Sequence, residues 1–216
     1  MKRSLLIAGG TGLIGSAVVE LAAKDTRFAR VITWGRRSTP NAPALVEHWG
    51  PGPNGLLEGL RGEPVDAVIC CLGTTMRNVK GDKAAFVHVD KELVLGLGRW
   101  ASDAKARFCL VSSLGADSTS RIFYNRVKGE VETELQRMPY QALHIFRPSV
   151  LDGPRSENRP GERVGLAVMK FFAPILPAAS RPMPYSTLAA ALVNTAAKED
   201  TGTQIHTYRS IVELAR

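Results

Sequence analysis

The sequence predicts an α/β fold built on a doubly wound parallel sheet, and three observations support this prediction. Short, almost continuously apolar runs alternate with amphipathic helical patterns from the first residues onward, which is typical of a parallel sheet covered by helices on both faces. A glycine-rich turn joins the first apolar run to the first helical pattern. The chain has 216 residues, which is enough to bury a core without disulfide or metal support.

The elements follow from the periodicity of the apolar residues. Strands are predicted over residues 4–8, 31–34, 44–48, 65–72, 108–111, 143–146 and 204–208. Helices are predicted over residues 13–22, 83–103, 124–137, 164–172 and 187–198, with a further helix at the end of the chain. We expect one domain over residues 1–216, in which the part after about residue 148 forms a small lobe on the substrate side.

The charge of the chain favours anionic partners. There are 28 Lys and Arg residues against 20 Asp and Glu residues, a formal net charge of +8. The basic residues are scattered, however, and no run resembles a nucleic-acid-binding arm. Net charge is therefore weak support for nucleic-acid binding.

The cysteines and the apolar segments indicate a cytoplasmic protein without a membrane span. Cys70, Cys71 and Cys109 cannot all pair internally, and the adjacent pair in an apolar run suits reduced, buried thiols. No Cys/His cluster suggests a metal site. The apolar N-terminal run resembles a signal peptide but is interrupted by glycines, and residues 166–179 are cut by Lys170 and two prolines.

The sharpest local motif is the turn after the first predicted strand. It reads G-x-G-x-x-G from Gly10 to Gly15 and is preceded by Gly9. Such a turn brings the backbone close to a pyrophosphate, and the helix that follows presents free N–H groups to the anion. The predicted dinucleotide contacts are Gly9, Thr11, Gly12, Leu13, Ile14 and Gly15. The alternative is a glycine-rich turn that binds no ligand.

The end of the second predicted strand favours NADP(H) over NAD. An NAD-binding chain usually carries an acidic residue there for the ribose 2′-hydroxyl, but this chain has Gly35, Arg36 and Arg37. Two guanidiniums would attract the 2′-phosphate of NADP(H). Asp25 falls at the end of the first helix, on the wrong side of the sheet. The alternative is a pair of solvated loop arginines.

The fourth predicted strand runs into Leu72, Gly73 and Thr74. In a parallel sheet the ligand lies outside the carboxyl ends of the strands, so a nicotinamide ribose could contact the backbone at this glycine-containing exit. Taken alone, the segment is equally well an ordinary strand end.

A serine pair and a Tyr/Lys pair supply the candidate chemistry. The fifth strand ends in Ser112 and Ser113, and Tyr124 and Lys128 follow at helical i,i+4 spacing. A phenol is a weak acid, and an ammonium one turn away favours its phenolate form, which makes acid/base work at neutral pH feasible. Lys128 could also bind ribose hydroxyls, while Ser113 donates to a substrate carbonyl. A bare Y-x-x-x-K also occurs by chance.

The ordered set of these motifs resembles the atypical or extended branch of the short-chain dehydrogenase/reductase superfamily. It is most similar to the Tat-interacting-protein oxidoreductases and their bacterial relatives. The segments that carry the resemblance are residues 35–37, 70–75, 124–132 and 156–162.

The resemblance implies NADPH binding at the glycine turn and Tyr124 as proton donor or acceptor. It further implies cofactor contacts by Arg36, Arg37, Leu72, Gly73 and Lys128, and by Leu151 and Arg159 after the sixth strand.

Two positions depart from the superfamily pattern. Many members carry an Asn on the helix after the fourth strand to complete a proton relay, but the comparable stretch here is His88-Val89-Asp90. The acidic adenine contact that is common after the third strand has no obvious counterpart in residues 47–50.

Two functions from different classes fit these motifs. The first is an NADPH-dependent oxidoreductase with an unidentified small-molecule substrate, and the second is a binding or regulatory protein that senses NADPH and catalyses little. Arginines over residues 147–163 could meet an anionic substrate or form a solvated loop. His88, His144 and His206 are interpreted as structural, and a homodimer through the two long helices is left open.

Overall fold

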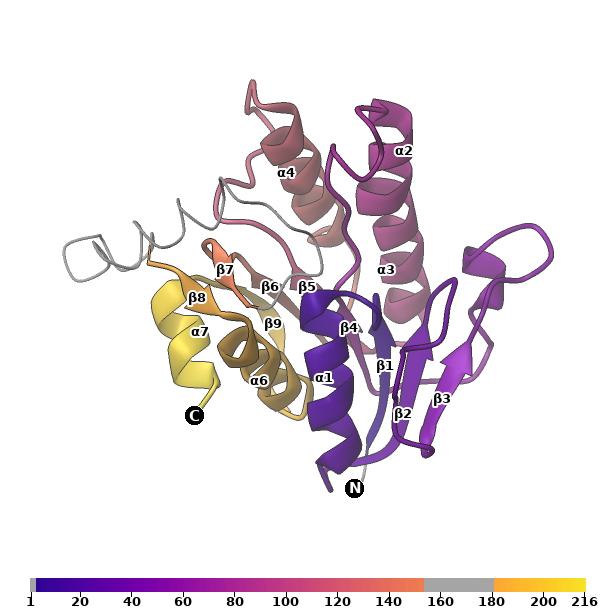
Figure 1. Cartoon of the computed structure of the whole chain (residues 1–216). Helices are drawn as coiled ribbons and strands as arrows, with labels where there is room; N and C mark the ends of the chain where they lie inside the picture. Colours follow the sequence, from indigo (N-terminus) through magenta and orange to yellow (C-terminus); the bar gives the residue numbers. More distant parts are fainter. Residues whose placement is uncertain (1–2, 154–180) are drawn as a thin grey trace.

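The computed structural model describes residues 3–153 and 181–216, and a seven-stranded parallel sheet forms its centre (Figure 1). The strands are β1 (Arg3–Ala8), β2 (Phe28–Trp34), β3 (Val46–Trp49), β4 (Ala67–Cys70), β5 (Arg107–Val111), β6 (Ala142–Phe146) and β9 (Gly202–His206). Their order is β3-β2-β1-β4-β5-β6-β9, and every neighbouring pair is parallel. The strand order reverses between β1 and β4, where doubly wound sheets bind their ligands. The predicted fold class is confirmed.

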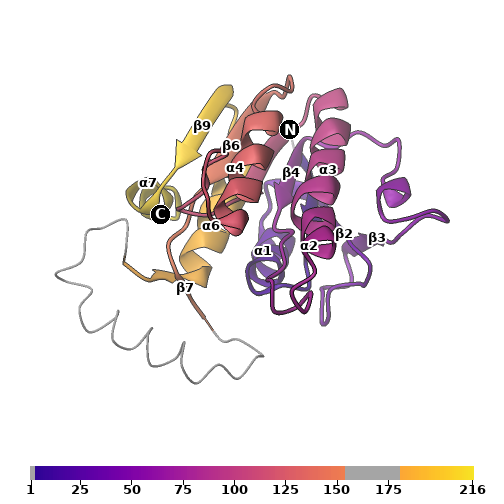
Figure 2. The ribbon, with the colours of Figure 1, turned by 90° about the horizontal axis from the view of Figure 1, so that it is seen from above.

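Helices cover both faces of this sheet, as Figures 1 and 2 show. One layer contains α1 (Leu13–Lys24), α6 (Tyr185–Ala196) and α7 (Tyr208–Leu214); the other contains α2 (Lys83–Val87), α3 (Leu93–Asp103) and α4 (Phe123–Leu135). Successive β1 residues alternate between the layers, so that Leu5 and Ile7 pack against α1 and α6 while Leu6 packs towards α3. Burying each such side chain contributes about 1.5–3 kcal/mol, which is why these strands are apolar throughout.

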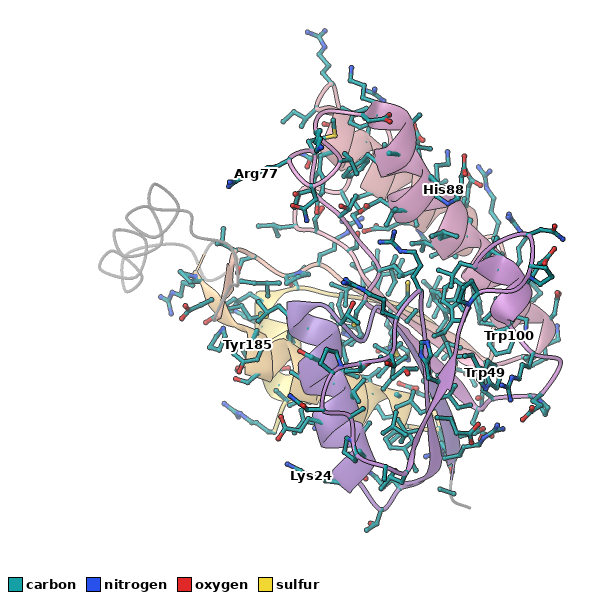
Figure 3. All side chains as sticks on the ribbon, turned by 45° about the vertical axis from the view of Figure 1, so that its right-hand side comes forward. Lys24, Trp49, Arg77, His88, Trp100 and Tyr185 are labelled. Carbon is teal, nitrogen blue, oxygen red and sulfur yellow. The ribbon has the colours of Figure 1, made fainter. Side chains whose placement is uncertain are left out.

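The outer edge of the sheet at β3 is fastened to the second helical layer by aromatic side chains. The rings of Trp49 at the end of β3 and Trp100 on α3 meet edge to face with centroids 6.2 Å apart (Figure 3). Arg30 and Arg61 lie over the Trp49 ring, and Arg30 is also paired with Glu47. This edge strand is therefore held although it has only four residues.

The helix predicted over residues 83–103 is not continuous. Between α2 and α3 lies a π-helical segment, His88–Glu92, which adds a residue to the turn. Figure 3 shows His88 on the outward side of this layer, and its imidazole is paired with the exposed Glu92 carboxylate at 2.8 Å. Asp90, in contrast, is turned inward and buried.

Other element boundaries differ modestly from the prediction. The fourth strand starts at Ala67 rather than at residue 65 and ends at Cys70, and a single 3-10 turn, Leu57–Gly59, precedes it. Two short strands that were not predicted, β7 (Leu151–Asp152) and β8 (Met183–Pro184), pair in parallel. The predicted helix over residues 164–172, and much of the expected lobe, lie outside the described residues.

The turn from β1 into α1 depends on two glycines for steric reasons. Gly9 has φ +81°, and a Cβ there would lie 2.7 Å from the carbonyl oxygen of Cys71. A Cβ on Gly15, in the first turn of α1, would overlap the carbonyl oxygen of Gly9. A Cβ on Gly12 would meet only that same oxygen, at 3.4 Å. Gly9 and Gly15 are therefore fixed by packing within the fold, and Gly12 is not.

Two histidines stack inside the sheet at its other edge. The rings of His144 on β6 and His206 on β9 are 5.3 Å apart, and His144 Nδ1 lies 3.0 Å from His206 Nε2. His144 Nε2 lies 3.3 Å from Asp200 Oδ1, and the buried Arg107 also donates to Asp200. Burial lowers the pKa of His206 to about 4 and also lowers the pKa of His144.

We expect stability to fall as the pH falls towards 4. An unfolded histidine takes up its proton near pH 6.5, but folded His206 resists protonation until about pH 4, so the unfolded state binds more protons in this range. The free energy of unfolding should decrease by about 2 kcal/mol between roughly pH 7 and pH 4.5 from His206 alone. Urea denaturation at several pH values measures this: His206→Gln should lose the contribution of His206, so its pH slope is smaller, and the exposed His88→Gln should keep it. Equal pH slopes in both variants would contradict the assignment.

We expect Gly15→Ala to destabilise the protein by about 2 kcal/mol or more, because the new methyl group overlaps a backbone carbonyl that cannot move without shifting the turn. Gly12→Ala is the matched control and should change the unfolding free energy by less than about 1 kcal/mol. Thermal and urea unfolding compare the two variants. Equal losses at both positions would mean that packing does not distinguish these glycines.

Candidate active site

The glycine turn leaves an open helix terminus at the carboxyl edge of the sheet. Gly12 is the N-cap of α1, has no side chain to accept hydrogen bonds, and is followed by a first turn without an acidic residue. The N–H groups of that turn and the positive end of the helix dipole suit an anion. Thr11 and Gly12 are exposed, Leu13 is half-buried, and Ile14 and Gly15 are buried, so the last two can contribute only backbone.

The segment after β2 carries the two arginines that were predicted to select NADP(H). Arg36 and Arg37 are both exposed, and among the described residues no carboxylate forms an ion pair with either. Asp25 does not compete, because it caps the far end of α1 and is held by Arg27 at 2.5 Å. Residues 35–42, which follow β2, include no acidic side chain at the place where an NAD-binding chain usually carries one for the ribose hydroxyl.

Sequence reasoning missed Thr39 in the same segment. Its side chain is buried beside Gly10, and its Oγ1 has no hydrogen-bond partner within the described parts of the chain. A buried hydroxyl without a partner is uncommon in native proteins. This orphaned atom lies beside the glycine turn, on a residue two positions after Arg37, and no sequence pattern marked it.

The exit of β4 lies next to Lys128. A Cβ on Gly73 would be 3.6 Å from Lys128 Nζ and 3.4 Å from Asp90 Oδ1, and the backbone N–H of Thr74 donates to Asp90 Oδ2 at 2.7 Å. Leu72 and Thr74 are half-buried and Gly73 is exposed. The structure thus brings together the β4 exit and the lysine of the Tyr/Lys pair, which are more than fifty positions apart in sequence.

Lys128 forms a buried ion pair with Asp90. The Nζ–Oδ1 distance is 2.7 Å, and both residues are almost fully buried. Burial by itself lowers the pKa of Lys128, but the Asp90 carboxylate, together with Tyr124 and Cys70, raises it, so the pKa lies above its ordinary value and the side chain stays an ammonium. The stretch that departs from the superfamily pattern, residues 88–90, thus carries a carboxylate that contacts the lysine directly.

Tyr124 lies at the start of α4 with a partly exposed side chain. Lys128 Nζ is 6.0 Å from the centroid of the Tyr124 ring, within the range of a cation–π contact. The ring also packs against Phe86, with centroids 5.8 Å apart. Tyr124 is therefore partly exposed while its ring contacts both an ammonium and an aromatic side chain.

The two serines at the end of β5 have different surroundings. Ser112 donates to Glu132, which is also held by Arg147 through Nε at 3.1 Å, so this serine belongs to a buried polar cluster. Ser113 Oγ is buried and has no partner among the described residues. The loop after it reaches α4, where the Asp117 N–H donates to the Asn125 carbonyl at 3.0 Å. Ser113 is thus the serine whose hydroxyl is available, in the loop that leads to Tyr124.

Exposed apolar side chains lie on the segments around these residues. Leu114 follows Ser113, Ile122 precedes α4, and Val150 lies between β6 and β7; all three are more than 40% exposed. The Leu114 N–H donates to the Pro148 carbonyl at 3.2 Å, which joins the β5 and β6 exits.

The two remaining predicted contacts lie beyond β6. Leu151 on β7 is half-buried, and Gly153, two residues later, would place a Cβ 3.1 Å from Leu13 at the start of α1. This segment therefore runs close to the glycine turn. Arg159 lies outside the described residues.

The cysteines contribute packing rather than chemistry. All three are free, and burial raises the pKa of Cys70 to about 11 and that of Cys109 to about 12. Within residues 3–153 and 181–216, no group of His, Cys, Asp and Glu could hold a metal ion. Over the same ranges no helix has both the length and the apolar character needed to cross a membrane.

Comparisons with known proteins agree with this geometry. The model of the NAD dependent epimerase/dehydratase family matches residues 5–145. The chain is 32% identical over 212 residues to the protein HTATIP2 of Rattus norvegicus, covering 89% of this chain and 81% of that one. It is 33% identical over 172 residues to the mitochondrial protein FMP52 of Eremothecium gossypii, covering 76% and 73%.

A solved structure supports the fold at lower identity. MoeE5 in complex with UDP-glucuronic acid and NAD superposes with a TM-score of 0.69 at 16% identity, covering 98% of this chain and 81% of MoeE5. The resemblance to the Tat-interacting-protein oxidoreductases is confirmed by the match to HTATIP2. The chain therefore belongs to the NAD dependent epimerase/dehydratase family, within the atypical short-chain dehydrogenases/reductases, which are NAD(P)-binding oxidoreductases.

Proposed function

We propose that this protein is an NADP(H)-dependent oxidoreductase that interconverts a small carbonyl compound and its alcohol, with Tyr124 as the acid/base. The observation that carries the proposal is the position of the buried Lys128 ammonium, which lies beside both the Tyr124 ring and the β4 exit. The same ammonium can thereby stabilise the phenolate of Tyr124 and bind the hydroxyls of a ribose.

The described residues fit a phosphorylated dinucleotide. The open terminus of α1 suits the pyrophosphate, Arg36 and Arg37 suit the 2′-phosphate, and residues 72–74 with Lys128 suit the nicotinamide ribose. The Ser113 hydroxyl, buried without a partner among the described residues, is free to bind a substrate oxygen. Leu151 and Arg159 are proposed as further contacts. When bound, the cofactor supplies or accepts the hydride.

The residues of the chain handle the proton. In the reducing direction Tyr124 donates its phenolic proton to the carbonyl oxygen, which becomes the alcohol hydroxyl, and Ser113 hydrogen-bonds that oxygen while negative charge develops on it. Lys128 stabilises the phenolate that remains. In the oxidising direction the phenolate takes the alcohol proton back.

A second candidate function is an NADPH-sensing protein with little catalytic activity. The observation in its favour is the replacement of the usual relay Asn by the stretch that contains Asp90, whose carboxylate is committed to Lys128 and Thr74. The two candidates differ in what three measurements should show. A sensor binds NADPH without turning over any substrate, and charge reversal at Arg36 and Arg37 alters its association with a protein partner, whereas Tyr124→Phe does not.

We further propose a cytoplasmic location, based on the three reduced thiols, although FMP52 relatives are named mitochondrial. The proposed partner is a small molecule, and a homodimer is kept as a proposal. Cell fractionation and light scattering test these points. If the protein bound nucleic acid through its net positive charge, its affinity for nucleic acid would fall steeply as the salt concentration rises.

The double variant Arg36→Ala/Arg37→Ala should weaken NADPH binding about 30-fold or more, because two charge-assisted hydrogen bonds to the 2′-phosphate are lost. NADH lacks this phosphate, so its affinity should change less than about threefold. Nicotinamide fluorescence titrations measure both, with the exposed Arg137→Ala as control. Equal loss of NADH and NADPH affinity would contradict a 2′-phosphate site.

Tyr124→Phe should lower kcat by about 100-fold or more for any aldehyde or ketone that the unmodified protein reduces, because the proton donor is removed. Its NADPH dissociation constant should stay within about threefold, since the ring and Lys128 remain in place. Loss of NADPH absorbance over a substrate panel measures turnover, and Tyr208→Phe on α7 is the control. Turnover that survives in Tyr124→Phe would exclude the phenol as acid/base.

A further inference from the structure

We propose that Asp90 is a positioning residue that keeps Lys128 charged and aimed at the cofactor ribose, and that it joins this lysine to the β4 exit. The inference rests on the proposed function, because it concerns the same NADP(H) site. It assigns a role to a residue at which the chain departs from the superfamily pattern.

The geometry places Asp90 at the meeting point of three segments. It comes from the π-helical segment, its Oδ1 is 2.7 Å from Lys128 Nζ on α4, and its Oδ2 accepts from the Thr74 N–H at 2.7 Å. Gly73 precedes Thr74 at this exit, and a Cβ on Gly73 would lie 3.4 Å from Asp90 Oδ1. Each carboxylate oxygen therefore fixes one of the two elements proposed to bind the nicotinamide ribose.

The π-helical turn explains why the carboxylate reaches this position. The widened turn separates Asp90, which is buried, from His88 and Glu92, whose side chains form an exposed pair. π-Helical turns are rare and are frequently found at functional sites. The distortion of this helix is thus consistent with a role for Asp90 beyond packing.

The charge of Asp90 matters because Lys128 has few other compensating groups. Within residues 3–153 and 181–216, the titratable groups that face Lys128 are Asp90 on the π-helical segment, Tyr124 on its own helix and Cys70 on β4. Burial raises the pKa of the Cys70 thiol to about 11, so it stays neutral near physiological pH. Without the Asp90 charge, a buried ammonium would lose its proton more easily.

Asp90→Asn removes the charge but keeps an acceptor for Thr74, and Asp82→Asn is the matched control. Asp82 is an exposed N-cap that accepts from Ala84 and Ala85 on the same helical layer. Both changes are made in the Tyr124→Phe background, which takes the Tyr124 hydroxyl beside Lys128 out of the measurement. NADPH dissociation constants are then measured by fluorescence between about pH 6 and pH 9.

We expect the dissociation constant of the Asp90→Asn protein, divided by that of the Asp82→Asn protein, to rise about tenfold or more as the pH increases over this range. The reason is that the unpaired Lys128 becomes neutral and no longer binds the ribose as a cation. Taking the ratio cancels titration of the 2′-phosphate itself. A ratio that stays constant, whatever its size, overturns the proposal, because a purely structural role weakens binding equally at every pH.

A stability measurement covers the case in which Asp90→Asn does not fold. Removing one partner of a buried ion pair is costly, whereas removing both often is not. Asp90→Asn/Lys128→Met should therefore have a higher Tm than Asp90→Asn, or should fold where the single variant does not. A double variant that is no better than the single one overturns the proposal.

The failure of this inference can be told apart from failure of the proposed function. If the unmodified protein does not bind NADPH, the proposed function fails. If it binds NADPH and the ratio is constant with pH, only the role of Asp90 fails.

Discussion

The buried ion pair between Lys128 and Asp90 is the interaction on which the candidate site depends. An ammonium can be retained in an apolar interior only if a counter-charge is brought to it, because the cost of removing it from water is otherwise several kcal/mol. The chain meets this requirement by interrupting a helix with a π-helical segment, which turns Asp90 inward to within 2.7 Å of Lys128. The other oxygen of the same carboxylate accepts from the Thr74 N–H at the β4 exit. Lys128, the π-helical segment and the β4 exit are therefore joined through one side chain.

The sheet topology explains why the β4 exit lies beside the glycine turn. The strand order reverses between β1 and β4, and a Cβ on Gly9 would come within 2.7 Å of the Cys71 carbonyl. The turn after β1 and the exit of β4 are therefore in direct contact at the carboxyl edge. A pyrophosphate at the first and a ribose at the second would be neighbours, as a dinucleotide requires.

Much of the fold was predictable from the sequence, because parallel strands that are buried on both faces must be apolar and the glycine turn has a strict steric purpose. The candidate site was predictable where a motif is local, as for Tyr124 and Lys128. The ion pair between Asp90 and Lys128 was not predictable, since apolar periodicity does not reveal an added residue in one helical turn. Thr39 was missed for a similar reason: only the folded chain places its hydroxyl beside Gly10. The β7–β8 pair was missed because two-residue strands have no periodicity.

NADP(H) is proposed to lie across the carboxyl edge with its extra phosphate at the arginine segment and its nicotinamide ribose at Lys128. A crystal structure of the protein with NADP⁺ tests this most directly. We expect the 2′-phosphate within hydrogen-bonding distance of Arg36 or Arg37 and a ribose hydroxyl within hydrogen-bonding distance of Lys128 Nζ, with the Asp90 ion pair intact. A dinucleotide bound elsewhere, or one whose nicotinamide faces away from Tyr124, would contradict this placement.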